Sequence, residues 1–238
     1  MTELLHSSTR RGLSGTALKY IACITMLIDH IGASCIEGSF SVVPAALSAL
    51  DLVLRLIGRL AFPIFCFLLV EGFQHTHDIR RYVSRMFLFG LVSELPFDLA
   101  FYRMPFYWAH QNVYWTLALG LLALAGIKHF ETDTGASTLK GMLCMLACAV
   151  AAELLHTDYG AIGVALIAAL YLTRASRKQQ CIIGAFMMLY ELTAPLAFVL
   201  IWFYTGQRGR CSKALQRGFY LFYPVHLALL AGVTNLLL

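Results

Sequence analysis

The chain has 238 residues, of which 59% are hydrophobic and only 13% are charged, and its formal net charge is +5. A soluble domain carries about twice that share of charged residues, and the mean hydropathy is +0.72. This composition excludes an ordinary soluble protein. It predicts an all-α, polytopic transmembrane bundle, because a helix satisfies its own backbone in lipid. We expect no nucleic-acid partner, since the basic residues fall in short loops between apolar runs.

The N-terminal residues are polar, and Arg10 and Arg11 precede the first apolar run. This pattern superficially resembles a signal peptide. The run that follows is long enough to cross a membrane, however, and its small-residue cleavage pattern is weak. We therefore expect residues 1–16 to form a cytoplasmic segment, followed by a single transmembrane domain over residues 17–238.

Apolar runs predict the membrane spans in chain order. They lie at 17–36, 46–71, 84–101, 113–128, 139–156, 159–174, 179–205 and 218–237. Basic residues flank alternate connections up to residue 178, so the positive-inside rule predicts a cytoplasmic N-terminus. The basic loop after residue 205 would lie outside if 179–205 were one span. Because Pro195 interrupts that segment, two short spans or a re-entrant hairpin would return the loop to the cytoplasm, giving eight or nine crossings.

Ionisable side chains inside these spans mark a candidate site, because each costs about 2.5–3.5 kcal/mol at the centre of a bilayer. Most of them map to the middle or the outer half of their spans. This placement predicts one wet cavity that opens toward the outside. The set comprises Asp29, His30, Arg55, Arg59, Glu71, Glu94, Asp98, Glu153, Glu191 and His226.

Asp29 and His30 are neighbours in the first span, so their side chains point about 100° apart on a helix. His30 can accept and return a proton near neutral pH, which makes it a candidate general base. Asp29 could hold a neighbouring group such as Arg59, or orient a histidine of another helix. The alternative is a polar pair that only joins helices by hydrogen bonds.

Arg55 and Arg59 are four residues apart and therefore lie on one face of the second span. Two guanidinium groups on one face suit an anion, either a phosphate or a pair of carboxylates. Gly58 between them allows another chain segment to approach closely, and Pro63 predicts a kink. The alternative is internal pairing of the arginines with acidic residues of the third span, Glu94 or Asp98.

The remaining candidates have two interpretations each. Asn112 and Asp158 fit either a helix cap or a substrate contact. His226 in the last span is either a functional group or a structural histidine. Cys144 and Cys148 lie one helical turn apart, which is more typical of small buried residues than of a metal pair, and we predict no metal site. Without a GxSxG, P-loop or HExxH motif, the residues alone indicate a membrane enzyme or a transporter.

Several blocks of the sequence resemble the TraX family, and they occur in the order of that family. They are LKYIACITMLIDHIG, RLIGRLAFPIFCFLLVEGFQHTHDIRRYVSRMFLFGLVSELPFDLAF, HQNVYWTLALGLL, DYGAIGV, YTGQRG and YLFYPVHLALL. The resemblance extends from Leu18 to Leu230. It implies an acyltransferase domain in a bacterial inner membrane that transfers an acetyl group from acetyl-CoA to an amine or hydroxyl. The best-known member of the family acetylates the N-terminus of conjugative F pilin, but a peptide, a sugar or a lipid could each be the acceptor here.

The resemblance also implies catalytic roles for four residues of this chain. His30 would be the general base that deprotonates the acceptor, or would carry the acetyl group transiently. Asp29, Glu94 and His226 would orient the reacting groups. These roles are coherent chemically, because aminolysis of a thioester needs a base and a stabiliser for the developing oxyanion.

The donor would be held by arginines. Arg55 and Arg59 would bind the thioester oxygen or the phosphates of CoA, while Arg81 and Arg85 would steer those phosphates from the cytoplasmic side. Two other functions remain open at this point. A proton-coupled transporter would also use a broken helix and clustered charges, and a membrane scaffold for an assembly would depend on surfaces rather than on buried acid–base groups.

Overall fold

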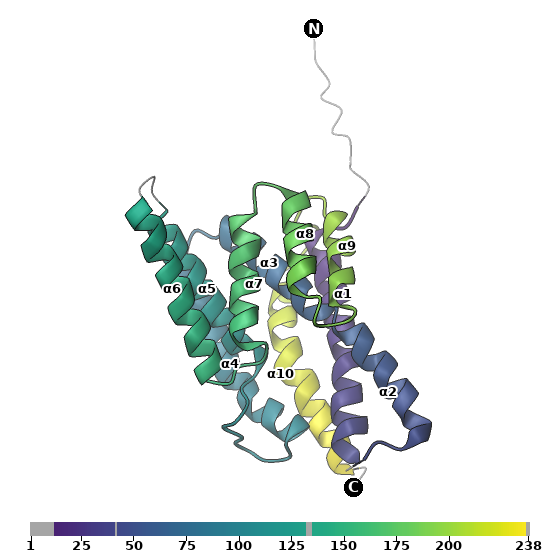
Figure 1. Ribbon diagram of the computed structural model, residues 1–238. Helices are drawn as coiled ribbons and strands as arrows, with labels where there is room; N and C mark the ends of the chain where they lie inside the picture. The colour runs from purple at the N-terminus through teal and green to yellow at the C-terminus, as the bar shows by residue number, and fades with distance from the viewer. Residues whose placement is uncertain (1–11, 41, 132–134, 237–238) are drawn as a thin grey trace.

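The computed structural model describes residues 12–40, 42–131 and 135–236 (Figure 1). Every regular element in these residues is helical, and the only β-type pairing among them consists of two isolated bridges. The all-α bundle predicted from the sequence is therefore confirmed. Most of the predicted N-terminal segment, residues 1–11, lies outside the described part of the chain.

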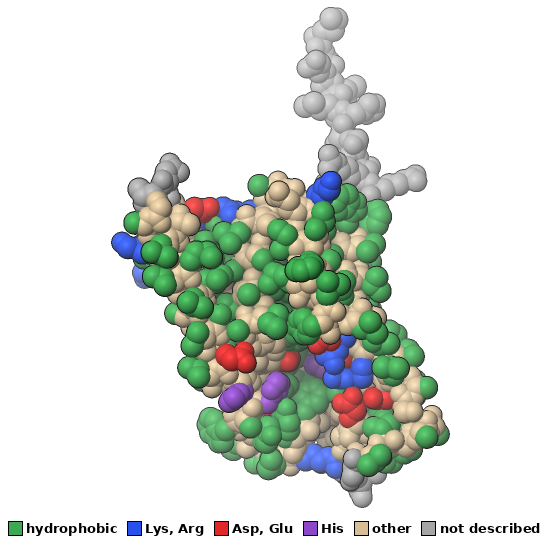
Figure 2. Space-filling view, viewed as in Figure 1, with side chains coloured by type: hydrophobic (Ala, Val, Ile, Leu, Met, Phe, Trp, Pro, Cys, Tyr) green, Lys and Arg blue, Asp and Glu red, His purple; other side chains and the backbone are tan. Residues whose placement is uncertain are grey.

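Long helical segments form the body of the described bundle and correspond one for one to the predicted spans, except at 179–205. They are α1 (Gly15–Ile31, extended by a π-helical turn Gly32–Ile36 and a 3-10 turn Glu37–Ser39), α2 (Ala45–Gly58) with α3 (Ala61–His75), α4 (Ile79–Phe101), α5 (Val113–His129), α6 (Gly135–Leu154), α7 (Gly160–Leu172) and α10 (Lys213–Leu236). Three segments, 15–39, 45–75 and 135–154, are long and apolar enough by themselves to cross a membrane. Large apolar side chains are exposed on α2, α4 and α6, and hydrophobic side chains cover much of the face seen in Figure 2, as expected where lipid is the solvent.

The segment 179–205 is a hairpin of two short helices, α8 (Arg177–Met187) and α9 (Ala197–Trp202), joined through a 3-10 turn at Ala194–Leu196. With 11 residues, α8 is about 16 Å long, roughly half of the hydrocarbon thickness of a bilayer. The legs pack tightly, because a Cβ on Gly184 would lie 2.2 Å from the ring of Phe198. Of the alternatives raised by Pro195, the structure has the re-entrant hairpin.

Both ends of this hairpin lie at the same end of the bundle as the start of α1 (Figure 1). Backbone N–H groups of residues 13, 15 and 16 donate to the carbonyl oxygens of Phe203, Gln207 and Arg208, each at 2.9 Å. The predicted return of the basic loop to the N-terminal side is thus confirmed. We call this end the basic end and the opposite one, where α1 finishes and α5 begins, the cavity end.

The break between α2 and α3 follows from Pro63, which has no N–H to donate to the carbonyl of Arg59 four residues earlier. Directly before the break, Gly58 packs against α1. A Cβ on Gly58 would lie only 2.0 Å from the Cβ of Asp29. The kink and the close approach predicted here are both confirmed, and together they bring the ends of α1 and α2 into contact at the candidate site.

Candidate active site

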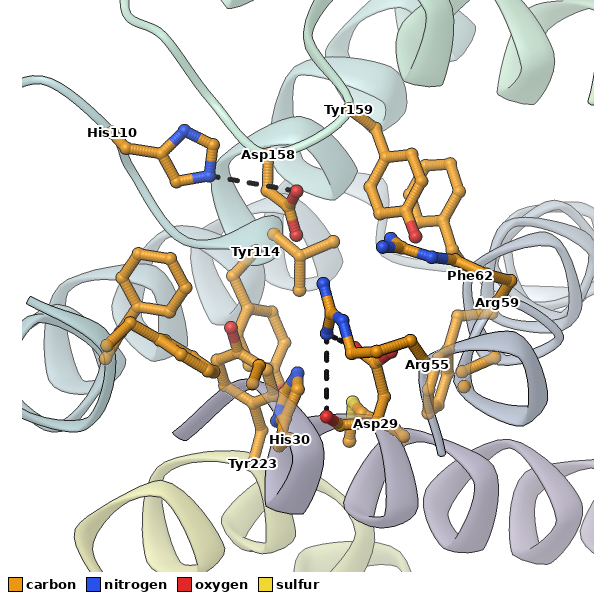
Figure 3. Close-up of a pocket in the computed structure, with 18 of the residues that line it drawn as sticks. Asp29, His30, Arg55, Arg59, Phe62, His110, Tyr114, Asp158, Tyr159 and Tyr223 are labelled. Carbon is orange, nitrogen blue, oxygen red and sulfur yellow. Dashed lines mark hydrogen bonds and ion pairs between the residues drawn. The ribbon is translucent and has the colours of Figure 1, made fainter. Parts of the chain in front are cut away.

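A cavity of about 410 Å³ lies toward the cavity end of the bundle, between α1, α2, α4, α5 and α10. Figure 2 shows acidic, basic and histidine side chains gathered around a hollow in an otherwise apolar surface. Four residues singled out in the sequence line the cavity, and Figure 3 shows them around one space: Asp29, His30, Arg55 and Arg59. The prediction of a shared polar cavity is therefore confirmed for these four.

A second cavity of about 410 Å³ adjoins the first and opens beside α6 and α7. The two cavities share Arg59, His110, Asp158 and Tyr159 as lining residues. Carboxylates and histidines dominate the polar lining of the second cavity. The pair of cavities therefore forms one polar region with two compartments and a shared wall.

The innermost part of the site is a pair of histidines from the first and last helices. His30 Nδ1 lies 2.7 Å from His226 Nε2, and the rings are nearly parallel with their centroids 5.0 Å apart. His226 is buried, whereas His30 lines the cavity. Phe101 and Tyr223 contact His30 edge-on, at centroid distances of 5.2 and 5.9 Å. Residues 196 positions apart in the chain thus form one hydrogen-bonded unit.

The hydrogen bonds of His226 determine the tautomer of a neutral His30. His226 Nδ1 lies 2.7 Å from the carbonyl oxygen of Phe222. A carbonyl oxygen only accepts hydrogen bonds, so His226 Nδ1 carries a hydrogen, and in a neutral His226 the other ring nitrogen, Nε2, is the acceptor. His30 Nδ1 is then the donor to His226, and the other ring nitrogen of His30, Nε2, keeps a lone pair. This is the form of imidazole that a general base requires.

Pro224 shapes α10 around this pair. Because proline lacks an N–H, the carbonyl of Tyr220, four residues earlier, loses its helical partner. The hydroxyl of Tyr114, which lines the cavity, donates to this carbonyl at 3.2 Å. The interruption in α10 is therefore satisfied by a side chain of α5, and it links the cavity wall to the helix that carries His226.

Arg55 is held between two carboxylates. Its Nη1 lies 2.7 Å from Asp29 Oδ2 and its Nε lies 3.2 Å from Glu37 Oε1. Glu37 follows the π-helical turn that widens the end of α1, and such turns are frequent at functional sites. The partner of Arg55 is thus Asp29, whereas the sequence pointed to Arg59 as the group that Asp29 holds.

Arg59 is paired with the tip of the re-entrant hairpin, since its Nε lies 3.1 Å from Glu191 Oε2. The Tyr159 hydroxyl lies beside the same guanidinium (Figure 3). Tyr159 has a left-handed backbone, with φ of 63°, and its ring stacks on Phe62 at 3.6 Å. Strained backbone of this kind is concentrated at functional sites. The packing fixes the hydroxyl next to Arg59.

The wall between the two cavities contains His110 and Asp158, from the loops before α5 and α7, with Nε2 and Oδ1 3.8 Å apart. Desolvation by burial raises the pKa of Asp158 to about 6, although the charges of Arg59 and Arg55 oppose the shift. Burial lowers the pKa of His110, and His156 lowers it further. At neutral pH this pair is therefore a carboxylate beside a neutral imidazole. Asp158 is a cavity residue rather than only a cap or turn residue.

The structure places Glu94 away from the cavity lining, although the sequence grouped it with the catalytic residues. Glu94 Oε2 accepts from Asn112 Nδ2 at 2.5 Å and from Trp115 Nε1 at 2.6 Å. Asn112 caps α5, because its side chain accepts from the N–H of Tyr114. Asp98 accepts from the N–H of Tyr107. The alternative in which these acids pair with Arg55 and Arg59 is wrong, because Glu94 and Asp98 instead fix the loop before α5.

Arg81 and Arg85 lie in the first two turns of α4, outside the lining of the cavity. Arg81 pairs with Asp78 at 3.3 Å, one turn away on the same helix end. Arg85 lies over the rings of Tyr82 and Tyr220, at 5.5 and 5.7 Å. Neither arginine lines the cavity. Arg55 and Arg59 are thus brought together with His30, whereas Arg81 and Arg85 are not.

Sequence reasoning missed three contributors to the site: Glu37, Tyr159 and the pairing of Glu191 with Arg59. Glu37 lies outside the predicted first span, so no burial cost drew attention to it. The sequence predicts Glu191 as an intramembrane acid, but its pairing with Arg59 depends on the geometry of the hairpin. For Tyr159 the only signal was its position in the block DYGAIGV.

Comparisons with known proteins agree with the resemblance noted in the sequence. Residues 14–234 match the family described as TraX protein. A protein of Dichelobacter nodosus described as "Probable fimbrial assembly protein FimC, serogroup H1" is 31% identical over 250 residues, which cover 92% of this chain and 95% of that protein. No solved structure matches. With a family match over nearly its whole length, this membrane protein belongs to the TraX family.

Proposed function

We propose that this protein is a membrane acyltransferase that transfers an acetyl group from acetyl-CoA to an amine or hydroxyl acceptor. One observation carries the proposal: the hydrogen-bonded pair of His30 and His226 leaves a lone pair on His30 Nε2, and His30 lines a cavity that also holds two arginines. A base beside a cationic group is the arrangement that acyl transfer requires. Membership of the TraX family supports it.

In the proposed reaction, His30 Nε2 takes the proton of the acceptor's amine or hydroxyl, while the acceptor's nitrogen or oxygen attacks the thioester carbonyl carbon. The negative charge that develops on the carbonyl oxygen is stabilised by a guanidinium. The carbon–sulfur bond then breaks, and the CoA thiolate leaves with the proton that His30 returns. His226 accepts a hydrogen bond from His30 throughout, so the ring keeps its orientation as it gains and loses charge.

The two arginines differ in this scheme. Arg55 is engaged by Asp29 and Glu37, so we assign it a positioning role in the wall of the cavity. Arg59 has one carboxylate partner, Glu191, and the neighbouring Tyr159 hydroxyl. We therefore assign stabilisation of the oxyanion to Arg59.

Two adjoining cavities offer room for two substrates. We propose that the basic end faces the cytoplasm, where acetyl-CoA is available, as the positive-inside rule predicts. The acceptor would then enter from the opposite side through the second cavity, past His110 and Asp158. A fimbrial or pilus subunit is one candidate acceptor, given the name of the Dichelobacter nodosus relative. Sugar hydroxyls and lipid head groups are others.

The proposal is tested first by ligand-dependent thermal stability in detergent, because this needs no acceptor. Acetyl-CoA should raise the melting temperature saturably, since a ligand that binds only the folded state stabilises it. Arg59→Ala should reduce the shift only in part and should lose transfer, because we assign Arg59 to the thioester oxygen. His30→Ala should retain binding and lose transfer in a CoA-release assay with candidate acceptors. A His30→Ala protein with full transfer activity would exclude the base role.

A proton-coupled transporter is the second candidate, because the tip of the re-entrant hairpin carries Glu191 in a charge pair with Arg59 inside the bundle. Transport in proteoliposomes without any acyl donor would favour it. A scaffold role predicts instead that His30→Ala and Arg59→Ala leave the cellular phenotype intact.

A further inference from the structure

The basic end contains a second cluster of cations, on α1, α4 and the loop before α10. Lys19 Nζ lies 5.7 Å from the ring centroid of Phe219, and Arg85 lies 5.7 Å from that of Tyr220, the next residue of α10. Arg208 lies close enough to Lys19 and to Tyr220 to interact electrostatically with both. Lys19 and Arg85 therefore each lie over one of two consecutive residues of α10, and Arg208 lies near Lys19 and near Tyr220.

This cluster has no acidic counterpart among the described residues. The ion pairs found among the described residues involve other cations, and none of these pairs includes Lys19, Arg85 or Arg208. Arg81, by contrast, is neutralised by Asp78. Like charges held together repel one another, so an uncompensated cluster favours an anion, and phosphate is the anion that such groups bind best.

The loop that supplies Arg208 is held in place. The Arg208 carbonyl accepts from the N–H of Thr16 at 2.9 Å and from its hydroxyl at 2.8 Å. Gly206 and Gly209, on either side, have φ of 76° and 78°, which only glycine adopts readily. The turn is therefore fixed against the start of α1, close to Lys19.

The cluster lies directly behind the end of the catalytic cavity. Phe219 lines that cavity, and Lys19 lies over the same ring. From Lys19 to His30 is 11 residues along α1, about 16 Å. This separation is comparable with the length of an extended pantetheine arm, which joins the phosphates of CoA to its thioester.

We propose that Lys19, Arg85 and Arg208 bind the phosphates of the nucleotide end of the acyl donor, with the arm passing Phe219 into the cavity. The inference rests on the proposed function and adds a binding site to it. It separates the two arginines of α4, because Arg85 belongs to the site and Arg81 does not. Phosphates of lipid head groups share this chemistry, so the test must separate the two sources.

The test measures apparent Kd by thermal shift in nanodiscs of neutral lipid and, in parallel, in nanodiscs that contain anionic lipid. Acetyl-CoA, adenosine 3′,5′-bisphosphate and the phosphate-free thioester S-acetyl-N-acetylcysteamine are compared. Lys19→Gln, Arg85→Gln and Arg208→Gln should each raise Kd for the first two ligands by about tenfold and leave the third unchanged. Lys140→Gln is the matched control, because Lys140 also lies over a phenylalanine ring at the basic end, at 5.9 Å from Phe130.

Unchanged Kd for acetyl-CoA and the bisphosphate in all three variants would overturn the inference. So would an effect that arises only in nanodiscs with anionic lipid and is equal for all three ligands, because the cluster would then bind head groups. The wild type could also bind the bisphosphate but neither acetyl-CoA nor the phosphate-free thioester. If the variants then lost bisphosphate binding, the phosphate site would stand and the proposed acyl transfer would be refuted. Circular dichroism verifies that each variant is folded.

Discussion

Gly58→Ala tests the contact between α1 and α2 that assembles the candidate active site. A Cβ at this position would lie 2.0 Å from Asp29 Cβ, 2.4 Å from its Cγ and 2.3 Å from its Oδ1. Unstrained carbon atoms approach to about 3.5–4.0 Å, so α1 and α2 must separate by about 1.5 Å or Asp29 must leave its position. The atoms in conflict belong to a short side chain near its backbone, so rotation alone cannot relieve the overlap.

The expected cost is about 1–3 kcal/mol, the range for overpacking a tightly packed site. For a chain of this length that corresponds to roughly 2–4 °C in melting temperature per kcal/mol. The Asp29–Arg55 bond, now 2.7 Å, should be lost, because a shift of this size exceeds hydrogen-bond range. We expect Gly58→Ala to melt lower in detergent and to lose most acyl transfer.

The matched control is Gly218→Ala in α10, where a Cβ would meet nothing within 4 Å. Alanine in an open helical position should leave stability unchanged or raise it by up to about 1 kcal/mol. If Gly58→Ala and Gly218→Ala both had the melting temperature and the transfer activity of the wild type, the packing argument for the site would be refuted.

Three further predictions concern individual contacts. His226→Ala should lower kcat by about 10–100-fold with little change in donor KM, because one hydrogen bond to a charged His30 is worth about 1.5–3 kcal/mol. His226→Gln should recover part of the lost kcat, because its amide oxygen still accepts a hydrogen bond. Equal kcat in the two variants would contradict the role of His226 as the hydrogen-bond acceptor of His30. Asp158 has a pKa raised to about 6, so its ionisation destabilises the folded state, and the wild type should lose stability relative to Asp158→Asn as pH rises from about 4 to 6. The two melting temperatures should be equal at about pH 4, and that of the variant should be higher at about pH 7. A difference in melting temperature that does not change with pH would show that the Asp158 carboxyl does not titrate in this range. Glu94→Ala should lower the free energy of unfolding by about 1–3 kcal/mol, because it leaves the Trp115 N–H unpaired, and it should red-shift tryptophan fluorescence. A Glu94→Ala variant with normal stability but without acyl transfer would show instead that Glu94 has a catalytic role.

Local patterns explain why much of the site could be predicted. Arg55 and Arg59 share a helical face because of their spacing of four, and both line the cavity with Asp29 and His30. Each of these ionisable side chains costs free energy inside a membrane, so its presence in an apolar span indicates a functional or paired group. The prediction was weakest for Glu94, whose partners Asn112 and Trp115 lie on another helix, so no local pattern distinguishes a loop anchor from a catalytic acid.

The sequence by itself determined the all-α membrane fold, the order of the helices, the kink at Pro63, the close approach at Gly58 and the return of the basic loop, because hydropathy, proline chemistry and charge asymmetry act locally along the chain. Only the tertiary structure decided which groups are partners. The bond between His30 and His226 and the pair of Arg59 with Glu191 join residues far apart in sequence. Such pairing depends on the relative placement of whole helices, which is set by packing across the bundle rather than by any neighbouring residue.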